Sequence, residues 1–247
     1  MKDNLMKLFG LLAFSIFFSC SHQKAEEPAA KESLASSTPP PPALQMKPTP
    51  ASSLNEVPTD TIIPAADRKY GVASGILTMD LEIVGANSKM KTTVYFDHYG
   101  KRESSETYSS TTLENGQHFD AHVMAFNLDG YQYQIDFDHK SASKFKYNPE
   151  AMSGGFSFAT MTEKMKKAYN VKKVGTETIL GKECDMYTMN GSDLKGSFSV
   201  WKNITFKLHT VSGGFTTDVI ARKFVENAAI PKEKFEVPAG FKLTVNK

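Results

Sequence analysis

The stretch GILTMDLEIVG, residues 75–85, decides the fold class. Its apolar residues stand at every second position from Leu77 to Ile83, and polar residues stand between them. Successive side chains of a β-strand point to opposite faces, so this period of two predicts a half-buried strand. The stretch GYQYQIDFD, residues 130–138, has the same alternation from Tyr131 to Phe137. The chain therefore reads as mainly β.

Turn signals separate the alternating stretches. They are the pairs Asp129-Gly130, Asn190-Gly191 and Gly213-Gly214, which are typical of tight hairpins, and Gly100 and Gly181, which mark further turns. Hairpin after hairpin predicts an antiparallel sheet, because an α/β enzyme would alternate strands with long helices.

One stretch breaks the alternation. In FSFATMTEKMKKAYNVKK, residues 156–173, the spacing predicts an amphipathic helix with its apolar face formed by Phe158, Met161, Met165 and Tyr169. Thr160 and Glu163 have the spacing of a capping box at its start. A second, short helical turn is predicted at Pro231, since proline is favoured at the first helical position. We expect an α+β fold with one helix against a curved sheet.

The N-terminus indicates export. Lys2 and Lys7 precede a short apolar run, residues 8–18, which is about half the ~20 apolar residues that span a bilayer. The run ends at Phe17-Phe18-Ser19-Cys20, and bulky-x-small-Cys resembles the bacterial lipobox. We expect Cys20 to carry the lipid attachment, including palmitate, as the new N-terminus of an outer-membrane lipoprotein. A non-lipidated signal peptide and a membrane-buried cysteine are the alternatives.

A tether follows the cysteine. Between residues 21 and 66 the chain has most of its 12 prolines, no glycine and no aromatic residue. This composition cannot bury enough apolar surface to fold, and proline favours extended polyproline II. We therefore divide the chain into a signal peptide (1–19), a lipidated, proline-rich tether (20–66) and one β domain (67–247).

Three motifs of the domain resemble a known family. GTETILGKECDMY (175–187), VWKNITFKL (200–208) and IPKEKFEVPAGFKL (230–243) are similar, in that order, to bacterial outer-membrane lipoprotein-sorting proteins and their uncharacterised lipoprotein relatives, a LolA/LolB-like group. The resemblance implies an unclosed half-barrel whose concave, apolar face is covered by helices and binds acyl chains or other apolar ligands. The resemblance indicates very little about the function of this chain.

The candidate ligand-binding residues are those of the helical stretch. Methionine adapts its shape to irregular apolar partners, which suits a lid over a cavity; fixed core is the alternative interpretation. The lid candidates are Phe156, Phe158, Met161, Met165 and Tyr169. The candidates for contact with an anionic head group are Lys164, Lys166 and Lys167, for which a solvated helix face is the alternative.

No combination of residues in the sequence predicts a catalysed reaction. His118, Asp120 and His122 share one face of a strand, but i to i+4 spans about 13 Å, too far for one metal ion. Cys184 has no fixed histidine partner and reads as a small buried hydrophobe. Asp97, Asp136 and Asp138 offer carboxylates that the sequence cannot bring together. We expect no catalytic residues, no metal, no cofactor and no enzymatic activity.

Charge limits the partners. The chain has 29 Lys and Arg against 27 Asp and Glu, too balanced for a nucleic-acid-binding protein. The expected partners are a membrane, held through N-terminal acyl chains, and a lipid, acyl chain or lipidated peptide. The alternative function is a structural lipoprotein that presents a rigid β domain to another envelope protein, on the periplasmic face or at the cell surface.

Overall fold

The computed structural model describes residues 63–146 and 158–246. Its strands are β1 (Gly75–Val84), β2 (Ser88–Asp97), β3 (Arg102–Thr112), β4 (His118–Leu128), β5 (Tyr131–Asp136), β6 (Ser141–Lys146), β7 (Lys172–Ile179), β8 (Lys182–Asn190), β9 (Leu194–Trp201), β10 (Ile204–Ser212), β11 (Phe215–Glu226) and β12 (Lys242–Val245). Its helical elements are α2 (Glu163–Ala168) and the 3-10 turns η1 (Ala65–Asp67), η2 (His98–Gly100), η3 (Phe158–Thr160) and η4 (Lys232–Phe235). The mainly β fold is confirmed.

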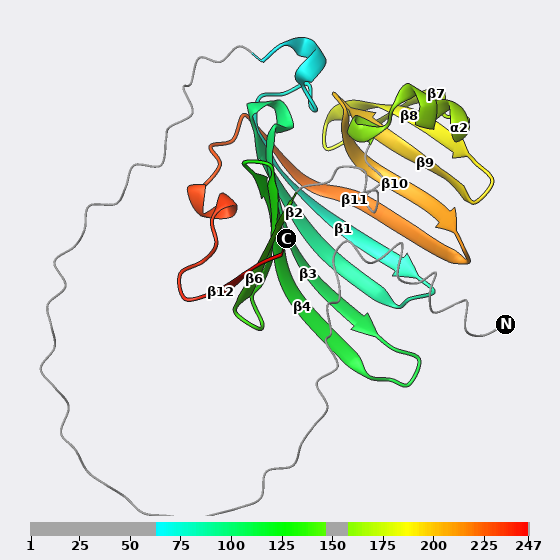
Figure 1. The fold of residues 1–247 in the computed structure, drawn as a ribbon. Helices are drawn as coiled ribbons and strands as arrows, with labels where there is room; N and C mark the ends of the chain where they lie inside the picture. The colour runs from blue at the N-terminus through cyan, green and yellow to red at the C-terminus, as the bar shows by residue number, and fades with distance from the viewer. Residues whose placement is uncertain (1–62, 147–157, 247) are drawn as a thin grey trace, which may run out of the picture. The chain divides into compact units, whose positions relative to one another are not determined.

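All twelve strands belong to one curved, unclosed sheet (Figure 1). The order is β12-β6-β5-β4-β3-β2-β1-β11-β10-β9-β8-β7, so two meanders run outward from the central pair β1 and β11. Every pairing is antiparallel except that of β12, which adds to the edge beside β6 in parallel. The edge strands β12 and β7 stay at opposite ends of the order, which leaves the barrel open.

Left-handed turn residues explain the tight hairpins. Asp129 and Gly130 have φ of 52° and 76°, and Gly213 and Gly214 have φ of 58° and 86°, which is what two-residue hairpin turns require. The expected tight hairpin at Asn190-Gly191 is wrong in detail: Asn190 is the last residue of β8, and β9 begins only at residue 194.

The sheet has two faces, which we name by central residues of β1. On the Leu77 face, Leu77, Phe96 and Phe206 form one buried cluster with Tyr70 and Val72 of the N-terminal segment. Gly75 belongs to this packing, because a Cβ there would lie 2.7 Å from the Phe96 ring and 2.8 Å from the Phe224 ring.

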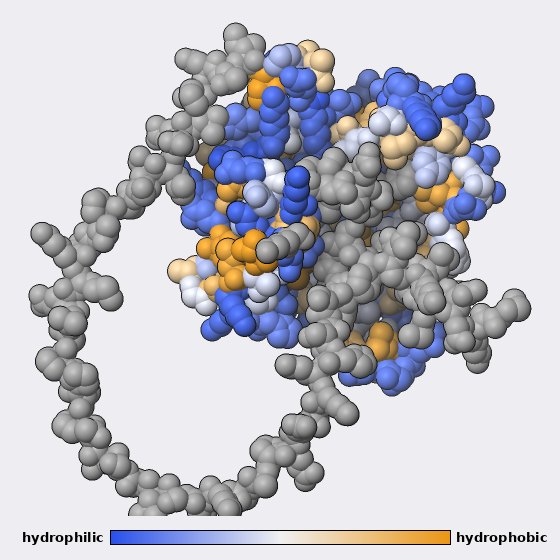
Figure 2. Space-filling model, in the orientation of Figure 1, coloured by the Kyte–Doolittle hydropathy of each residue, from blue (hydrophilic) through white to orange (hydrophobic). Residues whose placement is uncertain are grey.

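On the Asp80 face, the C-terminal segment closes a separate core. Met124, Phe126 and Ile135 pack there against Phe235 of η4 and against Phe241. Beyond this core, Figure 2 shows an apolar patch over the C-terminal segment, where Leu243 and Val245 of β12 are exposed.

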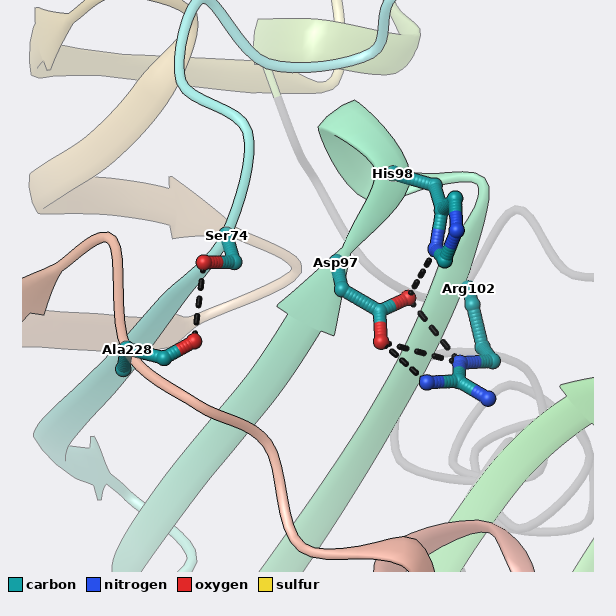
Figure 3. Close-up of polar contacts among 5 residues, drawn as sticks. All are labelled: Ser74, Asp97, His98, Arg102 and Ala228. Atoms are coloured by element: carbon teal, nitrogen blue, oxygen red, sulfur yellow. Dashed lines mark hydrogen bonds and ion pairs between the residues drawn. The ribbon is translucent and has the colours of Figure 1, made fainter. Parts of the chain in front are cut away.

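A clasp fixes the turn between β2 and β3 at one end of the sheet (Figure 3). Asp97 accepts hydrogen bonds from the guanidinium of Arg102 and from Nδ1 of His98 at 2.8 Å. His98 and Tyr99 both have positive φ, so the carboxylate holds a backbone conformation that is costly for these side chains. Beside it, Ser74 Oγ donates to the carbonyl of Ala228 at 2.8 Å, which ties the start of β1 to the segment after β11.

The predicted long helix is wrong. Only Glu163–Ala168 is helical, and its N-cap is Thr162, whose hydroxyl accepts a hydrogen bond from the Met165 backbone N–H at 3.2 Å. Thr162 is extended (φ −72°, ψ 159°), so the helix cannot begin at the proposed capping box, and Phe158 falls in η3 instead. The short turn after Pro231 is confirmed as η4, with the proline at the N-cap.

The described domain begins before the expected boundary at residue 67. Ile63 is only 5% exposed, and its carbonyl accepts a hydrogen bond from Arg68 Nε at 3.0 Å. The division of the chain at residue 67 stays a prediction, but part of the predicted tether is buried. Of the described residues, none belongs to a helix long and apolar enough to cross a membrane.

Candidate functional site

The Leu77 face has an apolar band that is only partly buried. Cross-strand pairing puts Leu81 of β1 between Met90 of β2 and Val219 of β11, and Leu208 of β10 continues the same row. Leu81, Met90 and Val219 are partly exposed, and none of them is part of the three core clusters of the described residues. Strand residues in such a row present a continuous apolar surface.

The stretch of lid candidates packs at one end of this face. Met161 is 7% exposed and joins a cluster with Met189, Phe198 and Val200 of β8 and β9. Phe158 contacts the same cluster, and its ring centroid lies 4.6 Å from that of Tyr187. Residues Phe158, Met161 and Tyr169, which flank α2, therefore pack against β8 and β9, and α2 lies beside this end of the sheet (Figure 1).

The other lid candidates differ in their surroundings. Tyr169 packs against the same cluster as Met161, whereas Met165 is half-buried on α2 and is not part of that cluster. Phe156 and the Gly154-Gly155 pair lie outside the described residues, as does Cys20. The roles of these residues as lid and lipid attachment stay predictions.

The candidate head-group lysines are not equivalent. Lys164 and Lys167 are exposed, but Lys166 pairs with Glu163 at 2.8 Å, and its ammonium lies 5.0 Å from the centre of the Phe158 ring. Since Lys166 already has an anionic partner, a head group would meet Lys164 and Lys167 first.

Toward β3, β4 and β5 the Leu77 face becomes more polar and includes the carboxylates of Glu103 and Asp136. Thr107, Ser109 and Gln132 are buried there. Gln132 of β5 is paired with Asn127 of β4, so both side chains leave the sheet on this face. Gln132 Oε1 and Asn127 Oδ1 are buried with no hydrogen-bond partner in the described structure. The row through Met90 crosses β3 at Ser109 and β4 at Ala121, six residues from Asn127, so these two acceptors lie about 20 Å along the strands from the apolar band, on the same face.

The residues considered for chemistry lie apart from this band. Cys184 is fully buried, as predicted, and burial raises the pKa of its thiol, which disfavours the reactive thiolate. His118, Asp120 and His122 project from the Asp80 face of β4, where Nε2 of His122 bonds to Glu106 at 2.9 Å. No group of His, Cys, Asp or Glu among the described residues is arranged to hold a metal ion.

The three aspartates engage separate neighbours. Asp97 belongs to the clasp with Arg102, Asp136 bonds to Nδ1 of His139 at 2.8 Å, and Asp138 accepts from the backbone N–H of His122 at 2.9 Å. They form no acid pair with one another in these contacts.

Sequence reasoning missed the strand residues of the band. It concentrated on the helical stretch, while Met90 and Val219 lie in strands that were not singled out and Leu208 was quoted only as the end of a family-like motif. Period-two alternation in residues 215–224 was the available signal, but it cannot say which strands become neighbours.

Several solved structures align with this chain. An uncharacterised conserved protein from Thermus thermophilus matches with a TM-score of 0.46 and 5% identity, over 70% of this chain and 91% of that chain. The lipoprotein LppX of Mycobacterium tuberculosis matches with a TM-score of 0.38 and 12% identity, over 65% and 91%. A LolA superfamily protein from Nitrosomonas europaea matches with a TM-score of 0.23 and 7% identity, over 67% and 90%.

The name of the last of these three structures is that of the superfamily that the sequence motifs resemble. No family model matches the chain, and no curated protein matches it.

Proposed function

We propose that this protein is a non-enzymatic envelope lipoprotein that binds an acyl chain, lipid or lipidated peptide on the Leu77 face. The observation that carries the proposal is the half-buried apolar row through Leu81, Met90 and Val219, because partly exposed apolar side chains in a contiguous row mark binding surfaces. The lipidated Cys20 holds the domain at the outer membrane, and η3–α2 acts as the cover over one end of the ligand.

The unsatisfied oxygens of Asn127 and Gln132 extend the proposal. The apolar row lies across β11, β1 and β2, and the two acceptors lie on the same face, about 20 Å along the strands toward the β2–β3 turn, so a long ligand chain has to run along the strands to reach them. A hydroxyl or amide at the polar end of the ligand donates a hydrogen bond to these acceptors. Acyl chains that end in an uncharged polar group therefore fit this face better than bare hydrocarbons do.

The test introduces a charge into the row. Leu81→Lys places an ammonium among apolar neighbours, whereas Glu82→Lys at the next position of β1 places it on the opposite face and serves as the control. Binding of a fluorescent fatty acid to the full chain should weaken at least tenfold in Leu81→Lys and remain unchanged in Glu82→Lys. The proposal is wrong if the unaltered chain binds no probe, or if both variants bind it equally well.

A further inference from the structure

A hollow of about 960 Å³ lies on the Asp80 face of the sheet, opposite the apolar row. Two adjacent rows of cross-strand neighbours line it on β11, β1, β2, β3 and β4. One row is Ile220, Asp80, Lys91, Tyr108 and His122. The other row is displaced from the first by two residues along each strand, toward the β1–β2 hairpin. At ~4.8 Å between neighbouring strands, four spacings make the hollow about 19 Å long across the strands.

A β-bulge aims one side chain into the hollow. Thr78 pairs with Lys223 while Met79 pairs with Ala221, so Arg222 is the extra residue of β11. Bulges commonly re-aim a side chain beside a site. Nε of Arg222 donates to Asp80 Oδ2 at 2.7 Å, and both residues line the hollow.

An aromatic platform stands at the other end. The Tyr108 ring stacks on His122 with centroids 4.0 Å apart, and His122 stacks on Phe137 at 4.0 Å. His122 is itself fixed by its bond to Glu106. Tyr108 remains 53% exposed, so it offers a backed, rigid ring to solvent. Rigid exposed aromatic rings supply contact area at little entropic cost.

The charges on β11, β1 and β2, at the end of the hollow away from the platform, are mixed in sign and loosely held. Glu82 and Lys89 are 3.7 Å apart with side chains 53% and 77% exposed, and Arg222 and Asp80 are also about half exposed. Exposed pairs of this kind contribute little to stability, so their hydrogen-bonding capacity is available to a ligand. The lining has five carboxylates, from Asp80, Glu82, Asp120, Asp138 and Asp218, and three cations, from Lys89, Lys91 and Arg222, so a polyanion and a polycation would each meet like charges.

We propose that the hollow binds an uncharged oligosaccharide. Sugar hydroxyls both donate and accept hydrogen bonds, which suits carboxylates, an arginine and lysines set side by side. The C–H face of a pyranose ring packs on Tyr108, and the chain extends across β2 and β1 toward Arg222. The side chains of this site leave the sheet on the opposite face from the apolar row, although Leu81 and Met90 of that row also border the hollow.

The test is isothermal titration of the full chain in a zwitterionic detergent with cellohexaose, chitohexaose, maltohexaose and mannohexaose. Heparin and poly-lysine are the charged comparisons. At least one neutral oligosaccharide should bind with a Kd at or below about 1 mM, tighter than either polyion. Tyr108→Ala should weaken that binding at least tenfold, and Asp80→Asn severalfold.

The control is Tyr131→Ala, which removes another exposed tyrosine outside the hollow and should leave saccharide binding unchanged. Thermal unfolding checks that each variant is folded, and Asp80→Asn tests the site without disturbing the ring stack. The inference is overturned if no neutral oligosaccharide binds, if heparin or poly-lysine binds more tightly, or if both variants bind as the unaltered chain does. Fatty-acid binding should be the same in all of them.

Discussion

The two faces of the sheet are built from the same strands but are held together by different forces. Around Leu77 the neighbours are apolar, and segments before β1 and before β7 close over them. Around Asp80 the neighbours are charged near the hairpin end, and the C-terminal segment docks through both apolar and polar contacts. Successive residues of one strand, such as Tyr95 and Phe96, therefore lie on different faces and have different surroundings.

Polar contacts fix the position of the C-terminal segment. Glu106 accepts from Lys234 Nζ at 2.8 Å and from His122 Nε2 at 2.9 Å, and the guanidinium of Arg102 lies 4.4 Å from the centre of the Phe235 ring. These contacts are directional, whereas apolar burial is not. The difference teaches that the Leu77 face is held by contacts without directional preference, while the polar contacts of the Asp80 face specify one arrangement of the C-terminal segment.

The largest effect should come from Phe96→Ala. Phe96 is 1% exposed and packs over Gly75 beside Tyr70, whose ring centroid is 4.5 Å away. Deleting such a ring costs about 3–5 kcal/mol, through lost burial and a residual cavity. Urea unfolding of the full chain should show a correspondingly lower midpoint. Phe119→Ala is the control, because Phe119 is 45% exposed on the same face and should cost less than half as much.

A smaller effect should follow from Glu106→Gln on the Asp80 face. The Glu106 side chain is 12% exposed. Burial raises its pKa, but the hydrogen bonds from Lys234 and His122, together with their charges, outweigh burial and leave the pKa below its ordinary 4.5. The substitution weakens bonds to a charged group and should cost about 1–3 kcal/mol near neutral pH.

The pH dependence of that cost has a defined sign. A carboxylate whose pKa is lower in the folded state stabilises the fold above its unfolded pKa, and this contribution is lost as the pH falls through the folded pKa. The difference in unfolding midpoint between the unaltered chain and Glu106→Gln should therefore shrink from pH 7 to about pH 3. Glu114→Gln, in the exposed β3–β4 hairpin, should show no such difference. A constant gap across this range would contradict the ionised network.

The sequence predicted the strands better than their surroundings. Alternation in residues 75–85 identified β1, because successive side chains of a strand point to opposite faces of the sheet. In β5, alternation alone was misleading, since Tyr131 is 39% exposed while Gln132 is 3% exposed. The C-terminal segment covers only part of the Asp80 face, and the burial of Gln132 depends on neighbours distant in sequence.

The candidate site was harder to predict because, like the burial of Gln132, it depends on neighbours that are distant in sequence. The helical stretch was visible, because Met161 and Phe158 are close in sequence and apolar. The row through Leu81, Met90 and Val219 depends on β1 lying between β2 and β11, a pairing that joins residues far apart in the chain. The helix has its N-cap at Thr162 and not at Thr160. A second threonine two residues further along the chain can therefore compete for the helix start.

The smallest effect should come from the pair Glu82 and Lys89, whose side chains are more than half exposed and 3.7 Å apart. Exposed pairs contribute about 0–1 kcal/mol and less in high salt, because ions screen them. Lys89→Ala and Glu82→Ala should each change the unfolding free energy by less than about 0.5 kcal/mol. A double-mutant cycle at low and at about 1 M salt measures the coupling directly. A coupling above about 1 kcal/mol would mean that the charges of the Asp80 face hold the sheet together. The expected small value leaves them available to the molecule that occupies the hollow, which is where the two faces differ most.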